Sequence, residues 1–261
     1  MKQRQTTKMT TFQAKLEQAA KKNNSLLCVG LDIDLAKVPH SLQEKDDAIL
    51  AFNTQVIEAT KDLVCAYKPN IAFYERYGIL GLQSLIKTIE LIHKYNIPVI
   101  LDAKRSDIGN SSKAYAEAVF NVFKADAVTV SPYMGQDSLQ PFLDFEDKGV
   151  FVLCLTSNKG ANDFQTSIYK QVAEKVKGWG KNAGLVVGAT KPEQIKEVRG
   201  IAPDLYFLIP GIGTQGGDLK ATLAASGEKS IINASRSIIY ADDIRGEAKK
   251  LRDEINGYRN R

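Results

Sequence analysis

Short apolar segments alternate with longer amphipathic segments along the whole chain. The apolar segments carry Val, Ile and Leu at consecutive positions, which is typical of parallel strands covered on both faces. The segments between them have apolar residues at helical spacing, as in residues 46–62, 80–96, 111–124 and 242–258. The pattern predicts eight strands, at residues 26–31, 64–68, 99–103, 127–130, 150–154, 184–187, 206–209 and 230–233.

Eight strand-then-helix units within about 250 residues predict an α/β fold, the (β/α)8 or TIM barrel. An extra N-terminal helix is predicted over residues 11–24. A doubly wound open sheet is the alternative arrangement of the same elements. Since no linker rich in glycine, proline or serine divides the chain, we expect one catalytic barrel domain over residues 11–261. Residues 1–10, which are basic and polar, are expected to form a flexible leader.

Polar residues gather where the predicted strands end. The first strand ends with Asp32, the second with Lys68, and the third runs into the sequence DAKRSD. The fifth, seventh and eighth strands run into TSNKGAND, PGIGTQGGD and NASRSIIY. Because the active sites of such barrels lie at the C-terminal ends of the strands, the sequence predicts a polar pocket there.

Asp102 and Lys104 are the most informative pair in these strand ends. On an extended strand, residues two apart project to the same side, so the carboxylate and the ammonium are expected to meet. Lys68, which ends a neighbouring strand, would extend the pair to a Lys-Asp-Lys array. Such clusters of buried charge are typical of functional sites, although a salt bridge that caps the barrel is an equally good interpretation of this motif alone.

The loops after the seventh and eighth strands indicate a phosphate site. Residues 210–218 are rich in glycine, which allows backbone N–H groups to approach an anion. Arg236 lies in the next loop, and its guanidinium suits bidentate phosphate contacts. Barrel enzymes often hold phosphate with these two loops, so we favour a binding site over a purely structural turn.

Composition narrows the classes of partner and cofactor. The net charge of +5 is spread over the predicted helices and the tails, so we expect no nucleic-acid site, and no apolar run reaches the length of a membrane span. Cys28, Cys65 and Cys154 lie in apolar segments and form no paired motif, which favours reduced thiols in a cytoplasmic protein. His40 and His93 are the only histidines, which argues against a histidine metal site or a Ser-His-Asp triad.

The sequence resembles the orotidine 5′-phosphate decarboxylase family. DAKRSDI, from Asp102 to Ile108, matches the family signature Asp-x-Lys-x-x-Asp-Ile, and the resemblance runs from about residue 11 to residue 240. KPNIAFYE and SPYMG resemble the longer bacterial branch of the family. The resemblance implies conversion of orotidine 5′-phosphate to UMP and CO2, the final step of de novo pyrimidine nucleotide synthesis, without a metal or an organic cofactor. The other supporting segments are CVGLD, AYKPNIAFYERYG, DAVTVSPYMG, LTSNKGA, LVVGAT, PGIGTQGGD and SRSIIYA.

The resemblance also implies roles for the charged residues. Asp102 would lie against the departing carboxylate, and Lys104 would lie beside carbon C6 and protonate it. Lys68, together with Asp32, would hold a ribose hydroxyl. Asp107 would cross the interface of a homodimer and enter the active site of the partner subunit.

The remaining implied contacts are with the base and the phosphate. Ser157 would form a hydrogen bond with the pyrimidine, and Gln215 and Arg236 would bind the phosphate. The aromatic segment after the second strand adds three candidates for lining the site, without assigned roles: Tyr74, Glu75 and Tyr77.

Two other functions stay open at this point. One is a Mg²⁺-dependent sugar-phosphate decarboxylase or aldolase of the same superfamily, which shares the short Asp-x-Lys-x-x-Asp motif but has no use for a pyrimidine contact. The other is a non-catalytic barrel that binds a nucleotide. The complete charged set counts against a binding protein, because buried charges are costly to retain without a function.

Overall fold

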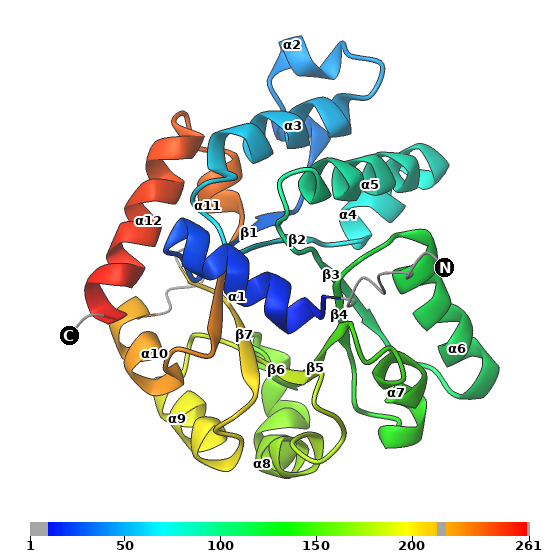
Figure 1. Ribbon diagram of the computed structural model, residues 1–261, viewed down its shortest axis with the longest axis vertical. Helices are drawn as coiled ribbons and strands as arrows, with labels where there is room; N and C mark the ends of the chain where they lie inside the picture. The colour runs from blue at the N-terminus through cyan, green and yellow to red at the C-terminus, as the bar shows by residue number, and fades with distance from the viewer. Residues whose placement is uncertain (1–9, 213–217, 260–261) are drawn as a thin grey trace, which may run out of the picture.

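The strands close into a parallel barrel. The computed structural model describes residues 10–212 and 218–259. Within them, the sheet has the strand order β2-β1-β8-β7-β6-β5-β4-β3, and parallel bridges from Tyr67 to Val99 and from Asn70 to Asp102 join its two ends (Figure 1). The strands are β1 (Leu27–Leu31), β2 (Ala66–Pro69), β3 (Ile100–Arg105), β4 (Ala127–Val130), β5 (Gly149–Leu155), β6 (Ala183–Val187), β7 (Tyr206–Pro210) and β8 (Ser230–Ala234).

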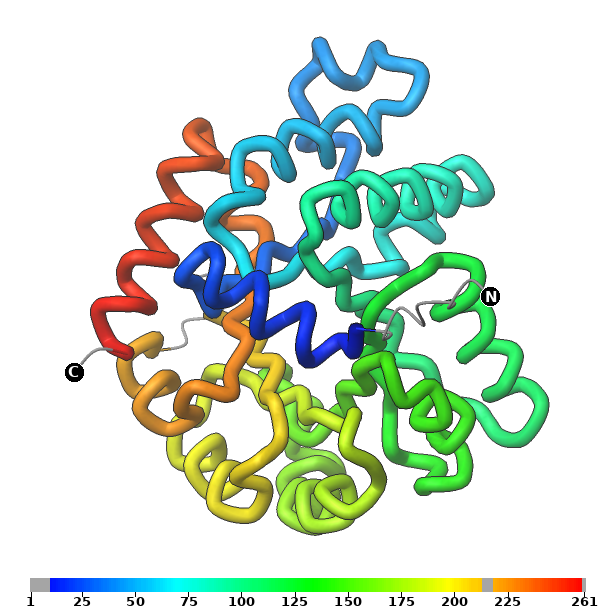
Figure 2. The backbone as a smooth tube through the Cα atoms, in the orientation of Figure 1, coloured from blue at the N-terminus to red at the C-terminus, as the bar shows by residue number. Residues whose placement is uncertain are grey.

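Helices surround the barrel, and one of them, α1 (Phe12–Asn23), crosses one end of it (Figure 2). The longer helices are α3 (Ala48–Thr60), α5 (Gly78–His93), α6 (Gly109–Glu117), α7 (Gln136–Leu143), α8 (Gln165–Val176), α9 (Pro192–Ile201), α10 (Leu219–Ser226) and α12 (Ile244–Arg259). The short segments are η1 (Leu35–Lys37), α2 (His40–Gln43), α4 (Ala72–Glu75), the π-helical turn η2 (Ala118–Val122), η3 (Lys159–Asp163) and α11 (Arg236–Ile239).

The predicted barrel with its extra N-terminal helix is confirmed, and the open sheet is wrong because β2 and β3 are joined. Every predicted strand lies within two residues of the observed one at each end. The strands are buried almost throughout, as parallel strands between an interior core and surrounding helices should be. The predicted leader falls, except for residue 10, outside the described residues.

Helix α1 fills the N-terminal end of the barrel. Phe12 and Leu16 are buried among side chains that point into the barrel, and the rings of Phe12 and Phe151 meet edge to face at 5.7 Å. Gly149 at the start of β5 makes room for this contact, because a Cβ there would lie 2.5 Å from the Phe12 ring. With this end closed, the other end of the barrel is the one left open to a substrate.

A buried carboxylate ties α1 to the barrel. Asp126, just before β4, accepts hydrogen bonds from Lys15 Nζ at 2.6 Å, from His93 Nε2 at 2.8 Å and from the Val99 N–H at 2.9 Å. Burial acts to raise the pKa of Asp126, but the hydrogen bonds and charges of His93 and Lys15 outweigh it and lower that pKa to about 2. The carboxylate is therefore ionised at neutral pH and holds three elements together.

Candidate active site

Three charged side chains meet at the C-terminal ends of β2 and β3. Lys68 Nζ lies 2.9 Å from Asp102 Oδ2, and Lys104 Nζ lies 2.6 Å from Asp102 Oδ1. The side chains of Lys68 and Asp102 are 5% and 11% exposed, whereas that of Lys104 is 47% exposed. Asp102 is thus bridged by two ammonium groups, of which only Lys104 is open to a ligand.

Mutual attraction keeps the array charged despite its burial. Burial acts to raise the pKa of Asp102, but Lys68 and Lys104 outweigh it and hold that pKa well below its usual range. For Lys68, burial acts to lower the pKa, and the carboxylates of Asp102 and Asp32 raise it above its usual range. Lys68 and Asp102 therefore both favour the ionised state at neutral pH.

The backbone that carries Asp102 and Lys104 is not a regular strand. Lys104 has a φ of +47°, in the left-handed region that residues with a side chain rarely adopt. The pairing of β3 with β4 is irregular between Leu101 and Arg105. Our expectation that simple strand alternation brings the two side chains together was therefore wrong in its reason, although the two side chains do meet.

The array forms part of the wall of a cavity of about 260 Å³ at the open end of the barrel. Residues of the strands β2 to β7 and of the loop after β5 contribute to it, so several of the strand-end motifs converge there. Its lining residues are Lys68, Asp102, Lys104, Thr129, Leu153, Thr156, Ser157, Asn158, Val186, Leu208 and Pro210.

Ser157 lies in the cavity wall because the loop after β5 is held close to β6. The Thr156 N–H donates to Gln165 Oε1 at 2.7 Å, and the Gly188 N–H donates to the Leu155 carbonyl at 2.8 Å. A Cβ at Gly188 would lie only 3.0 Å from the Ser157 nitrogen, so glycine permits the close approach. The structure thus brings a hydroxyl residue into the same cavity as the charged array.

Asp32 lies close enough to the array to raise the pKa of Lys68, but neither Asp32 nor Arg236 is among the residues that line the cavity. Asp32 follows β1; its Oδ1 is buried and accepts no hydrogen bond within the described residues. The Tyr240 hydroxyl fixes this segment by donating to the Asp32 carbonyl at 3.1 Å and accepting from the Asp34 N–H at 2.7 Å. Arg236 begins α11 and is exposed, while Ser235 Oγ donates to a carbonyl of β1 at 3.0 Å.

Of the two other predicted residues, Asp107 does not join the array. Asp107 is half-buried, its Oδ1 accepts the Ile108 N–H at 2.8 Å, and within the described part of the chain it forms no ion pair with Lys104. It is not among the residues that line the cavity of its own chain. Gln215 lies outside the described residues.

The aromatic segment after β2 supports the site from behind instead of lining it. Tyr74 is buried and its hydroxyl donates to the Leu31 carbonyl at 3.2 Å. The Tyr77 hydroxyl accepts the Leu35 N–H at 2.9 Å. Glu75 forms an ion pair of 2.8 Å with the last residue of β3. The two tyrosines therefore hold the end of β1 and the segment after it. This segment contains Asp32, the residue predicted to bind a ribose hydroxyl.

Thr129 belongs to the site although we did not predict it. It is buried in β4, and its Oγ1 donates to Asp102 Oδ1 at 2.8 Å. The sequence feature that could have identified Thr129 is its position as the single polar residue in the apolar strand AVTV, next to the strand that carries the charged residues.

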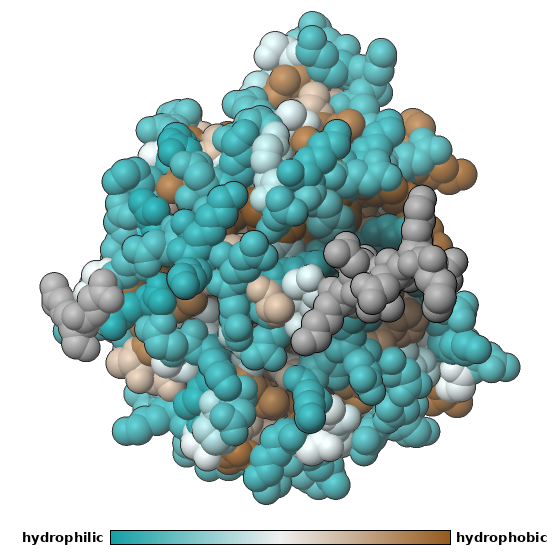
Figure 3. All heavy atoms as spheres, in the orientation of Figure 1, coloured by the Kyte–Doolittle hydropathy of each residue, from teal (hydrophilic) through white to brown (hydrophobic). Residues whose placement is uncertain are grey.

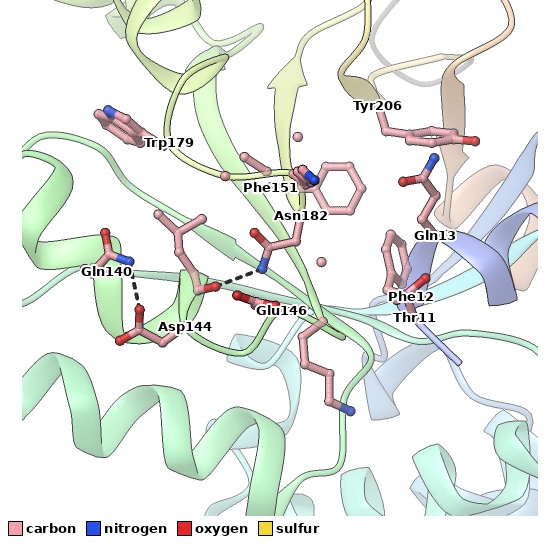
Figure 4. A pocket seen from close by; sticks show the side chains of 17 residues that line it. Thr11, Phe12, Gln13, Gln140, Asp144, Glu146, Phe151, Trp179, Asn182 and Tyr206 are labelled. Carbon is pink, nitrogen blue, oxygen red and sulfur yellow. Dashed lines mark hydrogen bonds between the residues drawn. The ribbon is translucent and has the colours of Figure 1, made fainter. Parts of the chain in front are cut away.

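A larger cavity, of about 500 Å³, lies at the opposite end of the barrel beside α1 (Figure 4). Its polar side chains pair with neighbouring groups: Asn182 Nδ2 donates to the Leu143 carbonyl at 3.1 Å, and Gln140 Nε2 donates to Asp144 Oδ1 at 2.8 Å. We assign the active site to the smaller cavity, because only that one of the two contains the buried charged array.

The described part of the chain holds neither a metal-binding cluster nor a membrane-spanning helix. Over residues 10–212 and 218–259, no three His, Cys, Asp or Glu side chains lie together as a metal ion would need. In the same part of the chain, no helix combines the length and the apolar character needed to cross a membrane.

Comparison with known proteins agrees with this geometry. The model of the "Orotidine 5'-phosphate decarboxylase / HUMPS family" matches residues 25–251. The orotidine 5′-phosphate decarboxylases of Dehalococcoides mccartyi and Herpetosiphon aurantiacus are 49% and 51% identical, covering 96% and 88% of this chain and 99% and 90% of the relatives. The solved structure of Leishmania donovani OMP decarboxylase has a TM-score of 0.86 at 44% identity, covering 97% of this chain and 100% of that one. The chain belongs to the orotidine 5′-phosphate decarboxylase family.

Proposed function

We propose that the protein decarboxylates orotidine 5′-phosphate to UMP and CO2, the last step of de novo pyrimidine nucleotide synthesis. Relatives with 49% and 51% identity over most of the chain carry the name of this enzyme. The observation that supports the proposal most is the Asp102 carboxylate, held at 2.9 and 2.6 Å by two ammonium groups at the open end of a barrel. This arrangement suits a reaction in which one negative group leaves and negative charge develops on carbon.

The reaction centre we propose consists of Asp102 and Lys104. The substrate carboxylate lies against Asp102, and the repulsion between the two carboxylates is relieved when CO2 departs. Cleavage of the C6–carboxylate bond leaves its electron pair on C6. The Lys104 ammonium stabilises that charge and donates a proton, which forms the C6–H bond of UMP; the neutral amine then regains a proton from water.

Three residues position the nucleoside. Lys68 and Asp32 bind a ribose hydroxyl, which gives the buried Oδ1 of Asp32 a donor that the described residues lack. Ser157 forms a hydrogen bond with the pyrimidine from the cavity wall. A pyrimidine contact has no purpose in a sugar-phosphate enzyme, so this assignment separates the proposal from the Mg²⁺-dependent alternative.

The phosphate binds to Arg236 and Gln215, at the loops after β8 and β7. Arg236 is exposed at the start of α11, where its guanidinium is accessible to an anion. The phosphate is remote from C6, so its binding energy is available to close the site and exclude water around the reacting carbon.

We also propose a homodimer in which Asp107 enters the active site of the partner subunit. Ile108, next to it, is 60% exposed, and Ile79 and Leu80 at the start of α5 are 76% and 74% exposed. Apolar side chains show at the edge of the molecule near α4 and α5, in contrast to the mainly hydrophilic face that carries α1 (Figure 3). Large exposed apolar side chains of this kind mark interaction surfaces, and a second copy of the chain is the occupant we propose.

No metal or organic cofactor takes part in the proposed reaction, because Lys104 supplies both the countercharge and the proton. The location we propose is the cytoplasm, where a soluble nucleotide is made and where the free thiols of Cys28, Cys65 and Cys154 stay reduced.

The proposal is tested by incubating orotidine 5′-phosphate with the protein in EDTA and measuring UMP. We expect full turnover in EDTA and no gain when Mg²⁺ is restored. Turnover that requires Mg²⁺ would favour the sugar-phosphate alternative. Tight binding of UMP without any turnover would favour a nucleotide-binding protein.

A further inference from the structure

The irregular pairing of β3 with β4 leaves one residue of β4 opposite three residues of β3. Leu101 pairs with Val128 and Arg105 pairs with Val130, so the three residues 102–104 of β3 face Thr129 alone. A strand with two extra residues leaves backbone N–H groups without carbonyl partners on the neighbouring strand. These N–H groups belong to the backbone that carries the reaction centre. The group that accepts their hydrogen bonds therefore fixes the backbone conformation there.

The hydroxyl of Thr129 replaces the missing partner. Its Oγ1 accepts the N–H of Ala103 and the N–H of Lys104, each at 3.0 Å, and lies 2.8 Å from Asp102 Oδ1. A hydroxyl has one proton and two lone pairs. Because the two amides occupy the lone pairs, the proton is left for the carboxylate, and Thr129 donates to Asp102.

The same hydroxyl holds Lys104 in an unfavourable conformation. The φ of +47° at Lys104 is unfavourable for a residue with a side chain and persists only where the surroundings enforce it. The bond from the Lys104 N–H to the buried Thr129 is such a restraint. From this backbone the Lys104 side chain reaches back to Asp102 Oδ1, the oxygen that Thr129 also contacts.

We propose that Thr129 is a positioning residue for decarboxylation: its hydroxyl fixes the backbone at Lys104 and the rotation of the Asp102 carboxylate. Oδ1 then faces Lys104 and Oδ2 faces Lys68. The proposal rests on the role assigned to Lys104 above. It concerns the alignment of the proton donor with C6, so it predicts a loss of kcat and little change in the affinity for UMP.

Replacement of the hydroxyl by a methyl group tests this. Thr129→Val keeps the shape of the side chain but leaves two backbone N–H groups and Asp102 without their partner. Because a displacement of about 1 Å can reduce a rate roughly 100-fold, we expect kcat to fall roughly 10- to 100-fold, with KM and UMP affinity changed less than about threefold. Thr129→Ser, which keeps the hydroxyl, should retain kcat within about threefold.

Two further variants separate positioning from folding. Thr60→Val removes another buried hydroxyl, which bonds to the Tyr67 hydroxyl at 2.7 Å and lines no part of the cavity, so it should lower stability and leave kcat unchanged. Thr129→Cys offers only a weak donor and acceptor, so its kcat should lie below that of the serine variant. This comparison tests the proposal even if the valine variant does not fold.

The outcomes distinguish this proposal from the one on which it rests. If Lys104→Ala keeps its turnover in the same assay, the assigned role of Lys104 fails whatever Thr129 does. If Lys104→Ala is inactive but folded Thr129→Val has the kcat of the wild type, only the role of Thr129 is wrong. Equal losses in the serine and valine variants, or a cysteine variant as active as the serine variant, would also overturn it.

Discussion

Lys104 illustrates how far a sequence can predict a single residue. That Lys104 lies close to Asp102 and Lys68 could be predicted from the charged residues at the ends of adjacent strands. Its left-handed backbone could not, because that conformation depends on a hydroxyl from another strand, and a propensity for lysine gives no sign of it. The role of Thr129 was hidden for the same reason, since one threonine in an apolar strand is ordinarily a packing residue.

The phosphate contact assigned to Arg236 can be tested at this scale. Hydrogen bonds to charged groups contribute about 1.5–3 kcal/mol, so Arg236→Ala should weaken UMP binding roughly 10- to 100-fold while scarcely changing the binding of orotidine, which has no phosphate. Titration calorimetry with both ligands measures the difference.

The matched control for Arg236 is Arg245→Ala, which removes an exposed arginine that pairs with Asp62 at 2.7 Å and should leave both affinities unchanged. An equal loss of affinity for UMP and for orotidine would show that Arg236 does not act on the phosphate.

Secondary structure elements were predicted more completely than their junctions. Continuous runs of Val, Ile and Leu place each strand within two residues, because burial on both faces imposes that composition. The largest departures are at β2, which begins two residues later than predicted, and at β3, which extends two residues further, to Arg105. Charged residues read as a loop in sequence, but here they continue the strand because each of them has a partner in the folded protein.

The ion pairs of Asp126, which attach α1 to the barrel, predict that the free energy of unfolding depends on pH. The pKa of Asp126 is about 2 when folded and about 3.9 in an unfolded chain, so the carboxylate stabilises the fold at pH values above about 4, and this contribution is lost as the pH falls towards 2. Its size is about 2–3 kcal/mol. Asp126→Asn should therefore lower the free energy of unfolding by about 2–3 kcal/mol at pH 7.

Urea denaturation of the wild type and of Asp126→Asn between pH 7 and pH 2.5 measures this contribution. The difference between the two proteins should shrink as the pH falls below about 4. Asp242→Asn, at an exposed position, is the control and should follow the wild type. A difference that stays constant over the whole range would mean that the charge of Asp126 does not stabilise the attachment of α1.

At the scale of the whole molecule, the barrel follows from the sequence, whereas assembly does not. Eight strand-then-helix units favour a closed barrel, so this topology could be predicted from the pattern, although an open sheet with helices on both faces would bury the same strands. The partner subunit leaves no comparable pattern. Asp107 merely follows Lys104 by three residues, and it is not among the residues that line the cavity of its own chain.

Mixed dimers test whether Asp107 serves the partner subunit. Lys104→Ala and Asp107→Ala chains, each nearly inactive alone, are unfolded together and refolded as a mixture. In a mixed dimer with shared sites, one site collects both defects and the other is intact. Random pairing makes half of the dimers mixed, so roughly a quarter of the wild-type activity should return. No recovery, with mixed dimers verified by mass, would mean that each Asp107 acts within its own subunit.

The central claim is that the array of Lys68, Asp102 and Lys104 contains the reaction centre, which is formed by Asp102 and Lys104. The most direct measurement is the turnover of orotidine 5′-phosphate by Lys104→Ala, followed as loss of orotate absorbance, beside a surface control, Lys170→Ala, whose lysine pairs with Glu197 on the outer helices. The account predicts near-complete loss of turnover in Lys104→Ala, with an unchanged circular dichroism spectrum, and full activity in the control. Turnover close to that of the wild type in a folded Lys104→Ala protein would contradict it.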